Sequence, residues 1–176
     1  AYFMSRTLAE VAMYDVTLNR ERDQLLRFTL RNTKLSELVR PADTVLATTA
    51  TVADALQMFF DYPVRFIYVV DEKNYYLGVI AQPELMRLVL NHNDVKEQPI
   101  GELLQLDYVK TLTPDMRLDQ AQAQFVDFVG ERLPVVRSVA EPRLIGVVYK
   151  SALLEKYSAL KRSLDATSEA LISLNR

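Results

Sequence analysis

The feature of the sequence that most constrains the fold is an internal repeat with an offset of 66 residues. The offset relates Phe59 to Phe125 on the apolar faces of two predicted helices. It also relates Tyr68 to Pro134 within two predicted strands. A spacing that is kept across a helix and a strand indicates that one structural unit is written twice.

Each copy of the repeat is predicted to have the order β-α-β-β-α. Runs rich in β-branched and aromatic residues flank a polar turn, which is typical of a β-hairpin. The four predicted hairpin strands are residues 66–71, 75–80, 133–137 and 144–148. A shorter strand and a helix precede each hairpin, at 45–47 and 109–112 for the strands, and a second helix follows it. The sequence therefore predicts a mixed α/β fold of two tandem modules packed as a pseudo-symmetric pair.

The repeat divides the chain into four predicted segments. We expect an N-terminal linker at residues 1–34, a first module at 35–97, a second module at 98–160 and a helical tail at 161–176. Within the linker, the alternation of Leu26, Phe28 and Leu30 with polar residues favours extended chain, although adjacent leucines at 25 and 26 also allow a helix. We predict an irregular linker with one short helix.

The tail carries a second periodic signal. A helix over residues 151–174 is predicted, because its apolar residues are spaced alternately by four and three. They are Leu153, Tyr157, Leu160, Leu164, Leu171 and Leu174, with Thr167 as one polar interruption. This stripe packs on its own module or frays past Leu164, or else it packs on a second copy or a neighbouring domain.

The composition argues against several classes of function. The chain has no cysteine, one histidine and a net charge of −2, so disulfides, thiolate metal sites and a general attraction to nucleic acid are not expected. The four glycines are far apart, which excludes a glycine-rich phosphate loop. His92 lies in a polar segment without partners for a catalytic or metal site. We therefore predict that the chain is not an enzyme and holds no metal.

The repeated order of helix, strand, turn, Gly78-Val79-Ile80 and helix resembles a CBS domain, the cystathionine β-synthase module. Two such units in tandem, over about residues 35–160, resemble a CBS pair. Upstream, Met13-Tyr14-Asp15-Val16-Thr17-Leu18 and Leu35-Ser36-Glu37-Leu38-Val39 are similar to the segment between the last membrane helix and the CBS pair of CLC-type chloride channels and transporters. That resemblance implies a module on the cytoplasmic side of the membrane, attached to a transmembrane domain of the same polypeptide.

CBS pairs often bind adenine nucleotides between their modules, so the resemblance implies a possible ATP, ADP or AMP site. The family's motif is a glycine, a serine or threonine three residues later, and an aspartate three residues after that. Here Gly78 is followed by Ala81 and Glu84, and Gly146 is followed by Tyr149 and Ala152. Both copies lack the serine or threonine hydroxyl, and only the first keeps a carboxylate, so Glu84 is the better candidate.

The other candidate contacts surround these motifs. Thr48 and Thr49 form the expected floor of the first site and Tyr62 a stacking surface for a base, while Pro134 belongs to the second copy with Tyr149. The alternative is that these residues have structural roles only. Both threonines would then be helix caps, Tyr62 would end a helix, and Glu84 would complete a helix N-terminus.

The resemblance implies a regulatory and dimerisation function for a CLC-type channel or antiporter, with a homodimer as the expected assembly and no nucleic-acid partner. Two alternatives stay open. One is a nucleotide-sensing CBS module of another transporter or of a soluble enzyme. The other is an assembly scaffold without a ligand, which the altered motifs favour.

Overall fold

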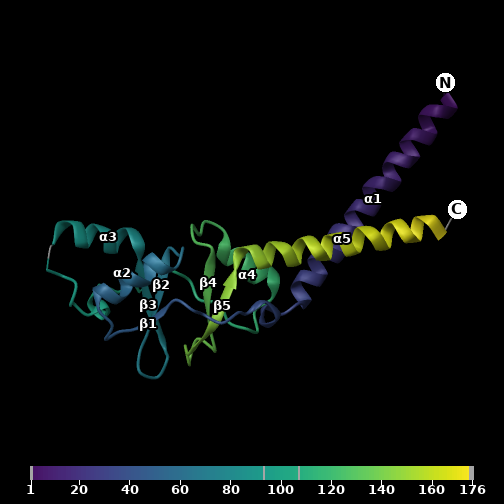
Figure 1. Cartoon of the computed structure of the whole chain (residues 1–176). Coiled ribbons are helices and arrows are strands. Elements are labelled where there is room, and N and C mark those ends of the chain that lie inside the picture. The colour runs from purple at the N-terminus through teal and green to yellow at the C-terminus, as the bar shows by residue number, and fades with distance from the viewer. Residues whose placement is uncertain (1, 93, 107, 175–176) are drawn as a thin grey trace.

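The computed structural model describes residues 2–92, 94–106 and 108–174, and side chains from residue 8 onward. Figure 1 shows two small α/β modules side by side, with two long helices projecting from the second. The helices are α1 (Tyr2–Asn32), α2 (Val52–Asp61), α3 (Gln82–Asn91), α4 (Leu118–Phe125) and α5 (Lys150–Leu174), with 3-10 turns η1 (Leu35–Leu38) and η2 (Ile100–Leu103). The strands are β1 (Val45–Ala47), β2 (Phe66–Val70), β3 (Tyr76–Ala81), β4 (Arg132–Val136) and β5 (Leu144–Tyr149).

The first module has the predicted β-α-β-β-α order. Its sheet runs β1-β2-β3, with β1 parallel and β3 antiparallel to β2. Thr51 caps α2 in a capping box, since its hydroxyl accepts from the amide of Asp54 and the Asp54 carboxylate accepts from the amide of Thr51. The hydrogen bond from the backbone amide of Thr51 makes the largest contribution to lowering the pKa of Asp54 below its ordinary value, and the hydrogen bond with the Thr51 side chain lowers it further. The mixed α/β fold is therefore confirmed for this module.

The second module contains a sheet of only two strands, β4 and β5. The strand predicted at residues 109–112 is reduced to one bridge between Leu112 and Val135. The reason lies at Pro134, which occupies the position of Tyr68. In the first module the amide of Tyr68 donates to the carbonyl oxygen of Thr44 (3.2 Å), whereas proline has no N–H and cannot make this bond.

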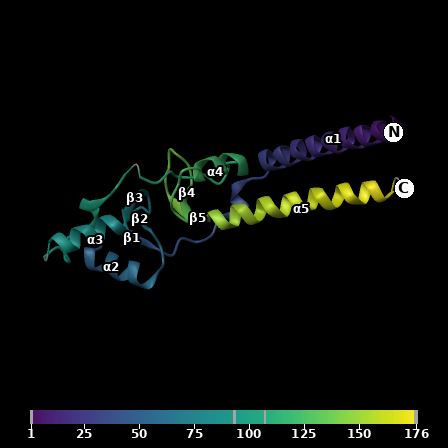
Figure 2. The ribbon, with the colours of Figure 1, turned by 90° about the horizontal axis from the view of Figure 1, so that it is seen from above.

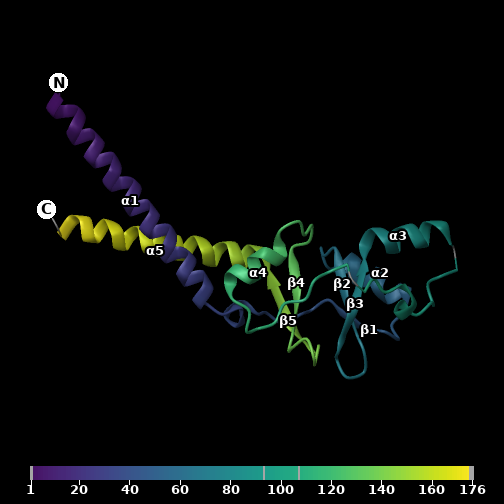
Figure 3. The same cartoon turned by 180° about the vertical axis from the view of Figure 1, so that it is seen from behind.

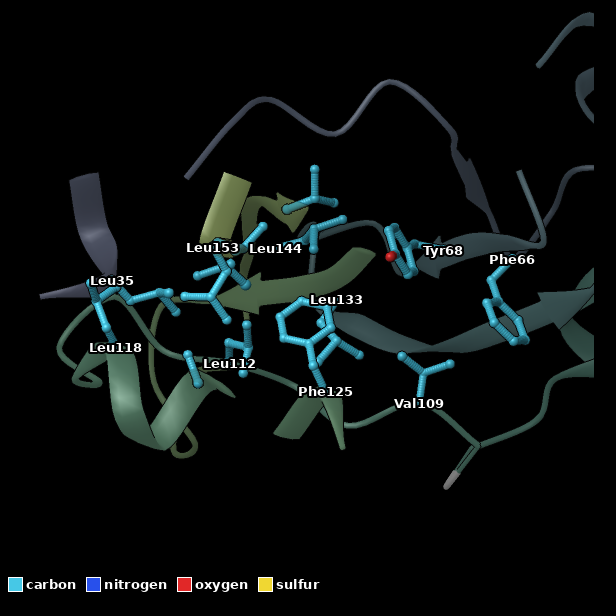
Figure 4. Packing of buried hydrophobic residues seen from close by; sticks show 14 of the residues in the cluster. Leu35, Phe66, Tyr68, Val109, Leu112, Leu118, Phe125, Leu133, Leu144 and Leu153 are labelled. Carbon is cyan, nitrogen blue, oxygen red and sulfur yellow. The ribbon is translucent and has the colours of Figure 1, made fainter. Parts of the chain in front are cut away.

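The two modules pack as a pair, as predicted, and their contact runs through the sheets. Side chains of β2 alternate between two apolar clusters. Ile67 and Val69 face α2 and α3, while Phe66, Tyr68 and Val70 join a larger cluster with the second module. Figure 4 shows Tyr68 and Phe66 close to this shared core. Both faces of β2 are therefore buried, and the two modules share one core.

The irregular linker predicted at the N-terminus is wrong, because α1 is one helix of 31 residues. The sequence up to Asn32 contains neither glycine nor proline, so nothing interrupts a helix once its C-terminal end is packed. Leu26 and Leu30, four residues apart, are buried in the shared core, whereas Phe28 is exposed. The alternation of these three residues therefore comes from two sides of one helix and not from extended chain.

The helix α5 confirms the predicted tail helix over residues 151–174. Figures 1 and 3 show α1 and α5 leaving the second module on the same side, with both chain ends far from the first module. The view from above in Figure 2 shows them running alongside each other. Leu153 is buried, and Tyr157, Leu160 and Leu164 pack against the shared core. The first half of the stripe thus packs on its own chain.

The first segments of the two modules, which follow η1 and η2, are exchanged between the modules. The amide and carbonyl of Arg40 pair with those of Val147 in β5, with both hydrogen bonds at 2.8 Å. In the equivalent contact, Gln105 pairs with Val79 in β3 at 3.0 and 3.2 Å. Each sheet is therefore extended by a segment that the sequence repeat assigns to the other module.

Both exchanged segments cross a glycine. A Cβ atom on Gly78 would stand 2.8 Å from the carbonyl oxygen of Gln105, and one on Gly146 would collide with the carbonyl oxygen of Arg40. Contacts this close to backbone atoms cannot be relieved by a side-chain rotation. The glycines at these two positions are thus required by the crossing.

We expect Gly146→Ala to lower the free energy of unfolding by about 1–3 kcal/mol, because the added methyl group overpacks against backbone. Gly101→Ala is the matched comparison and should cost less, since its Cβ would lie 3.1 Å from the nearest atom, the carbonyl oxygen of Thr48. Urea unfolding followed by circular dichroism measures both. If Gly146→Ala and the unsubstituted chain were equally stable, the close approach of the Arg40 backbone to Gly146 would be contradicted.

Candidate functional site

The first candidate site lies where β3 passes into α3. Ala81 ends β3, pairs with Phe66 at the start of β2, and is buried. Glu84 lies exposed in the first turn of α3. The amide of Gln82 donates to the carbonyl oxygen of Arg65 (3.0 Å), which places the exposed Arg65 beside the N-terminus of α3. We call Arg65, Phe66, Ala81 and Glu84 the first-module site.

The electrostatics of the first-module site favour an anion. The N-terminus of α3 carries the positive end of the helix dipole, and Arg65 adds a full positive charge. The carboxylate of Glu84 is already paired with Arg87, one turn later, at 3.0 Å. This pair partly compensates the negative charge of Glu84, and the pair is exposed, so the carboxylate stays accessible as a hydrogen-bond acceptor.

The structure separates Thr48 and Thr49 from Glu84, which corrects the expectation that they form the floor of one site. Thr48 follows β1, and its amide donates to the carbonyl oxygen of Val70 (3.2 Å), at the far end of β2 from Phe66. Five strand residues separate the two ends by about 13 Å, too far for contact with one ribose or one phosphate. The physical reason is strand direction, because β1 is parallel to β2.

The threonine at the correct end of the sheet is Thr44, which is fully buried. Its hydroxyl accepts a hydrogen bond from the guanidinium of Arg132, which is only 3% exposed. The same guanidinium donates to Asp43 (3.3 Å) and to the carbonyl oxygen of Phe66 (3.4 Å). Arg132 belongs to β4, so it joins the second module to the first beside the first-module site.

Tyr68 lines the contact around Arg132. Its guanidinium carbon lies 5.0 Å from the centre of the Tyr68 ring, and the Tyr68 hydroxyl donates to the carbonyl oxygen of Arg132 (3.2 Å). Burial raises the pKa of Tyr68 and of its neighbour Tyr76 above the ordinary value. Both rings therefore remain neutral, and Arg132 supplies the positive charge in this contact.

Aromatic side chains gather at the same end of β2. The ring of Phe66 lies 5.6 Å from that of Tyr108 and 5.8 Å from that of Phe128. Tyr108 is more than half exposed and can offer a face to a planar ligand. Tyr62, the residue predicted to stack on a base, caps the end of α2 three positions before Arg65 and is also exposed.

The equivalent position in the second module differs in charge and in space. Glu131 takes the place of Arg65, since its carbonyl oxygen accepts from the amide of Lys150 at the start of α5 (2.8 Å). Tyr149 replaces Ala81 and packs against the shared core. Pro134 is buried within β4, and its carbonyl oxygen accepts from Leu112 (2.8 Å). This position therefore presents a carboxylate in place of a guanidinium to an incoming anion.

The described residues contain no group of three or more histidine, aspartate or glutamate side chains arranged to hold a metal ion. Five cavities along α1, α4 and α5 are lined by described residues, and none of these five includes Arg65 or Glu84. No helix in the described part of the chain is long and apolar enough to cross a membrane.

Sequence reasoning missed Arg65, Tyr108 and the contact of Arg132 with Thr44. The repeat offset could have found the first, because it pairs Arg65 with Glu131 and so shows a reversal of charge between the copies. The same offset makes Arg132 the equivalent of Phe66 in the repeat. The second copy thus has a cation where the first has a buried aromatic residue, which is an unusual replacement. The position of Tyr108 depends on the exchanged segment, which no local pattern indicates.

Comparisons with known proteins support the fold. Residues 35–91 match the family model of the CBS domain, and no curated protein matches the chain. A CBS domain pair/ACT domain protein from Thermotoga maritima has a TM-score of 0.58 at 22% identity, covering 70% of this chain and 95% of that one. CBSX2 in complex with AMP has a TM-score of 0.60 at 20% identity (74% and 99% covered). The soluble part of a magnesium transporter has a TM-score of 0.59 at 17% identity (74% and 49% covered).

We expect Arg132→Met to lower the free energy of unfolding by about 1–3 kcal/mol, because it removes the hydrogen bonds to Thr44 and Phe66 while keeping an apolar side chain of similar length. Asp43→Asn is the control, since Asp43 is 57% exposed and an exposed ion pair contributes less than about 1 kcal/mol. Urea unfolding distinguishes the two variants. A larger loss for Asp43→Asn than for Arg132→Met would contradict this assignment.

Proposed function

We propose that this chain, which has the fold of a CBS domain pair, is a regulatory module that binds one adenine nucleotide at its first-module site. The observation that carries the proposal is the position of Arg65 beside the N-terminus of α3. A helix N-terminus and an arginine together suit a phosphate group, because both supply N–H donors and positive potential.

The remaining parts of a nucleotide find partners near the same end of β2. Glu84 can accept hydrogen bonds from the two ribose hydroxyls, since its carboxylate is exposed in the first turn of α3. The exposed ring of Tyr108, which contacts the ring of Phe66, suits stacking with a purine. Tyr62 is a second candidate for this contact. The structure of CBSX2 with AMP supports an adenine nucleotide as the ligand class.

The second-module position is unsuited to the same ligand, so we propose one nucleotide per chain. A phosphate there would face the carboxylate of Glu131 instead of a guanidinium. Tyr149 occupies the position at which the first module has the small Ala81, and Ala152 offers no carboxylate for a ribose.

In its finer form, the proposal is that this pair regulates a CLC-type chloride channel or antiporter from the cytoplasmic side. The resemblance of residues 13–18 and 35–39 to the linker of that family supports it, as does a neighbour that is part of a membrane transporter. The segment between α1 and the site is short: Leu35 is buried in the shared core, Arg40 pairs with β5, and Thr44 contacts Arg132. A movement at the site is thereby connected to α1.

A ligand-free assembly scaffold is the second candidate function. The specific observation in its favour is that neither copy has the serine or threonine of the family motif, because Ala81 and Tyr149 stand there. In this case the CBS pair would act only through the surfaces that it presents to its partners.

Calorimetric titration with ATP, ADP and AMP tests the proposal. We expect micromolar binding with a stoichiometry of one. Arg65→Glu, which introduces the charge of the second module, should weaken binding by about 10- to 100-fold or more, the usual value of a charge-assisted hydrogen bond. Glu84→Ala should weaken it by a similar factor.

Glu97→Ala is the control, because Glu97 is an exposed carboxylate in the loop between α3 and η2. The affinity of this variant for the nucleotides should equal that of the unsubstituted chain. The absence of heat with all three nucleotides at millimolar concentration would reject the nucleotide proposal and favour the scaffold. A stoichiometry of two would contradict the assigned difference between the modules.

A further inference from the structure

We propose that the groove between the outer halves of α1 and α5 is the surface through which two copies of this chain associate. We define the outer halves as residues 8–25 of α1 and 164–174 of α5. This inference concerns surfaces remote from the first-module site and does not depend on nucleotide binding.

The groove is large and apolar. It has a volume of about 520 Å³, and six apolar side chains from both helices contribute to its lining. They are Tyr14, Leu18 and Leu25 of α1, and Leu164, Leu171 and Ile172 of α5. Polar side chains of both helices complete the lining, among them Glu21 and Arg22 of α1. A large apolar groove with polar residues around it is the pattern of a protein interaction site.

The groove continues an interface that is already formed within the chain. Near the second module, Leu26 and Leu30 of α1 lie in one apolar cluster with Leu153 and Tyr157 of α5. An ion pair between Arg22 and Asp165 (2.7 Å) joins the helices at the outer end of this contact. Beyond it, Figure 1 shows the two helices diverging, so the stripe on each helix continues beyond its contact with the other.

The spacing of the stripes indicates that the missing partner is helical. Leu164, Leu171 and Leu174 continue the alternation of four and three that packs on α1 closer to the module. On α1, apolar residues recur every seven positions at 11, 18 and 25. Apolar residues at this period pack best against another helix with the same period. The outer halves of a second copy carry both matching stripes.

A two-fold axis at the groove would make the contact self-complementary. Each copy would insert its outer helices into the groove of the other, which gives a bundle of four helices and closes the assembly at two chains. The exposed apolar residues of the outer halves are Leu8, Val11, Met13, Tyr14, Val16, Leu25, Leu171, Ile172 and Leu174, each between 41% and 81% exposed. Together they offer an area on the order of the 800 Å² per partner that a stable dimer buries.

The experiment measures the mass of the full chain in solution by sedimentation velocity and light scattering. We expect a dimer at micromolar concentration. The double variant Tyr14→Lys/Leu171→Lys should be a monomer, with a dissociation constant raised at least about 100-fold, because it places a cluster of lysines from both copies at the centre of the bundle. Both residues are more than half exposed, so circular dichroism and melting temperature at monomeric concentrations should not change.

Phe60→Lys/Leu90→Lys is the matched control. These residues are exposed apolar positions of α2 and α3 in the first module, at 86% and 83% exposure, and their replacement should leave the dimer intact. A dimer that survives the groove variant would overturn the inference, and its loss in the control instead would assign association to the modules. A monomeric unsubstituted chain would also overturn it. If that monomer bound phosphatidylcholine vesicles and the groove variant did not, the groove would belong to a lipid surface.

Discussion

The two backbone crossings, Arg40 on β5 and Gln105 on β3, are the constraint on which the rest of the structure depends. Each supplies the edge of one sheet with hydrogen bonds from a segment that belongs to the other half of the sequence. Separating the modules would leave these backbone groups without partners and open a core that both modules share. The pair therefore behaves as one unit, although the sequence is written as two.

The same exchange of segments determines which helices can be coupled to a movement between the modules. Because the segment after α1 crosses to the second module and then returns to β1, residues 33–44 contact both modules within a dozen positions. Lys156 of α5 reaches this segment as well, through an ion pair with Glu37 at 3.0 Å. A ligand that bound two arrangements of the modules with different affinity would shift α1 and α5 together.

The backbones of the two modules are pseudo-symmetric, but side chains at equivalent positions differ in their chemistry. Phe66 and Arg132 occupy equivalent positions, yet one packs in an aromatic group and the other carries the charge that joins the modules. Arg65 and Glu131 are equivalent with opposite charges. Such exchanges leave the fold intact, because the positions are either exposed or satisfied by new hydrogen bonds. They are the basis on which we propose one nucleotide site per chain.

Sequence patterns predicted the elements whose residues carry their own periodicity. The hairpins, the helix before the first hairpin and the α5 stripe were all predicted, since alternation and heptad spacing are local properties. The long helix α1 was not, because Leu26 and Leu30 identify its buried side only once the shared core is known. The prediction that Thr48 and Glu84 belong to one site was wrong for a similar reason, since strand direction decides which residues lie at the same end of a sheet.

The sequence by itself therefore determined that one α/β unit occurs twice, that the second copy lacks both functional groups of the ligand motif, and that a helix forms the tail. The tertiary structure alone decided that the copies exchange their first segments, that Arg132 reaches Thr44 across 88 positions, and that Arg65 lies beside the α3 N-terminus. Local spacing records which side of an element is apolar. It does not record which distant backbone supplies the hydrogen bonds at a sheet edge, and in this protein those bonds come from the other module.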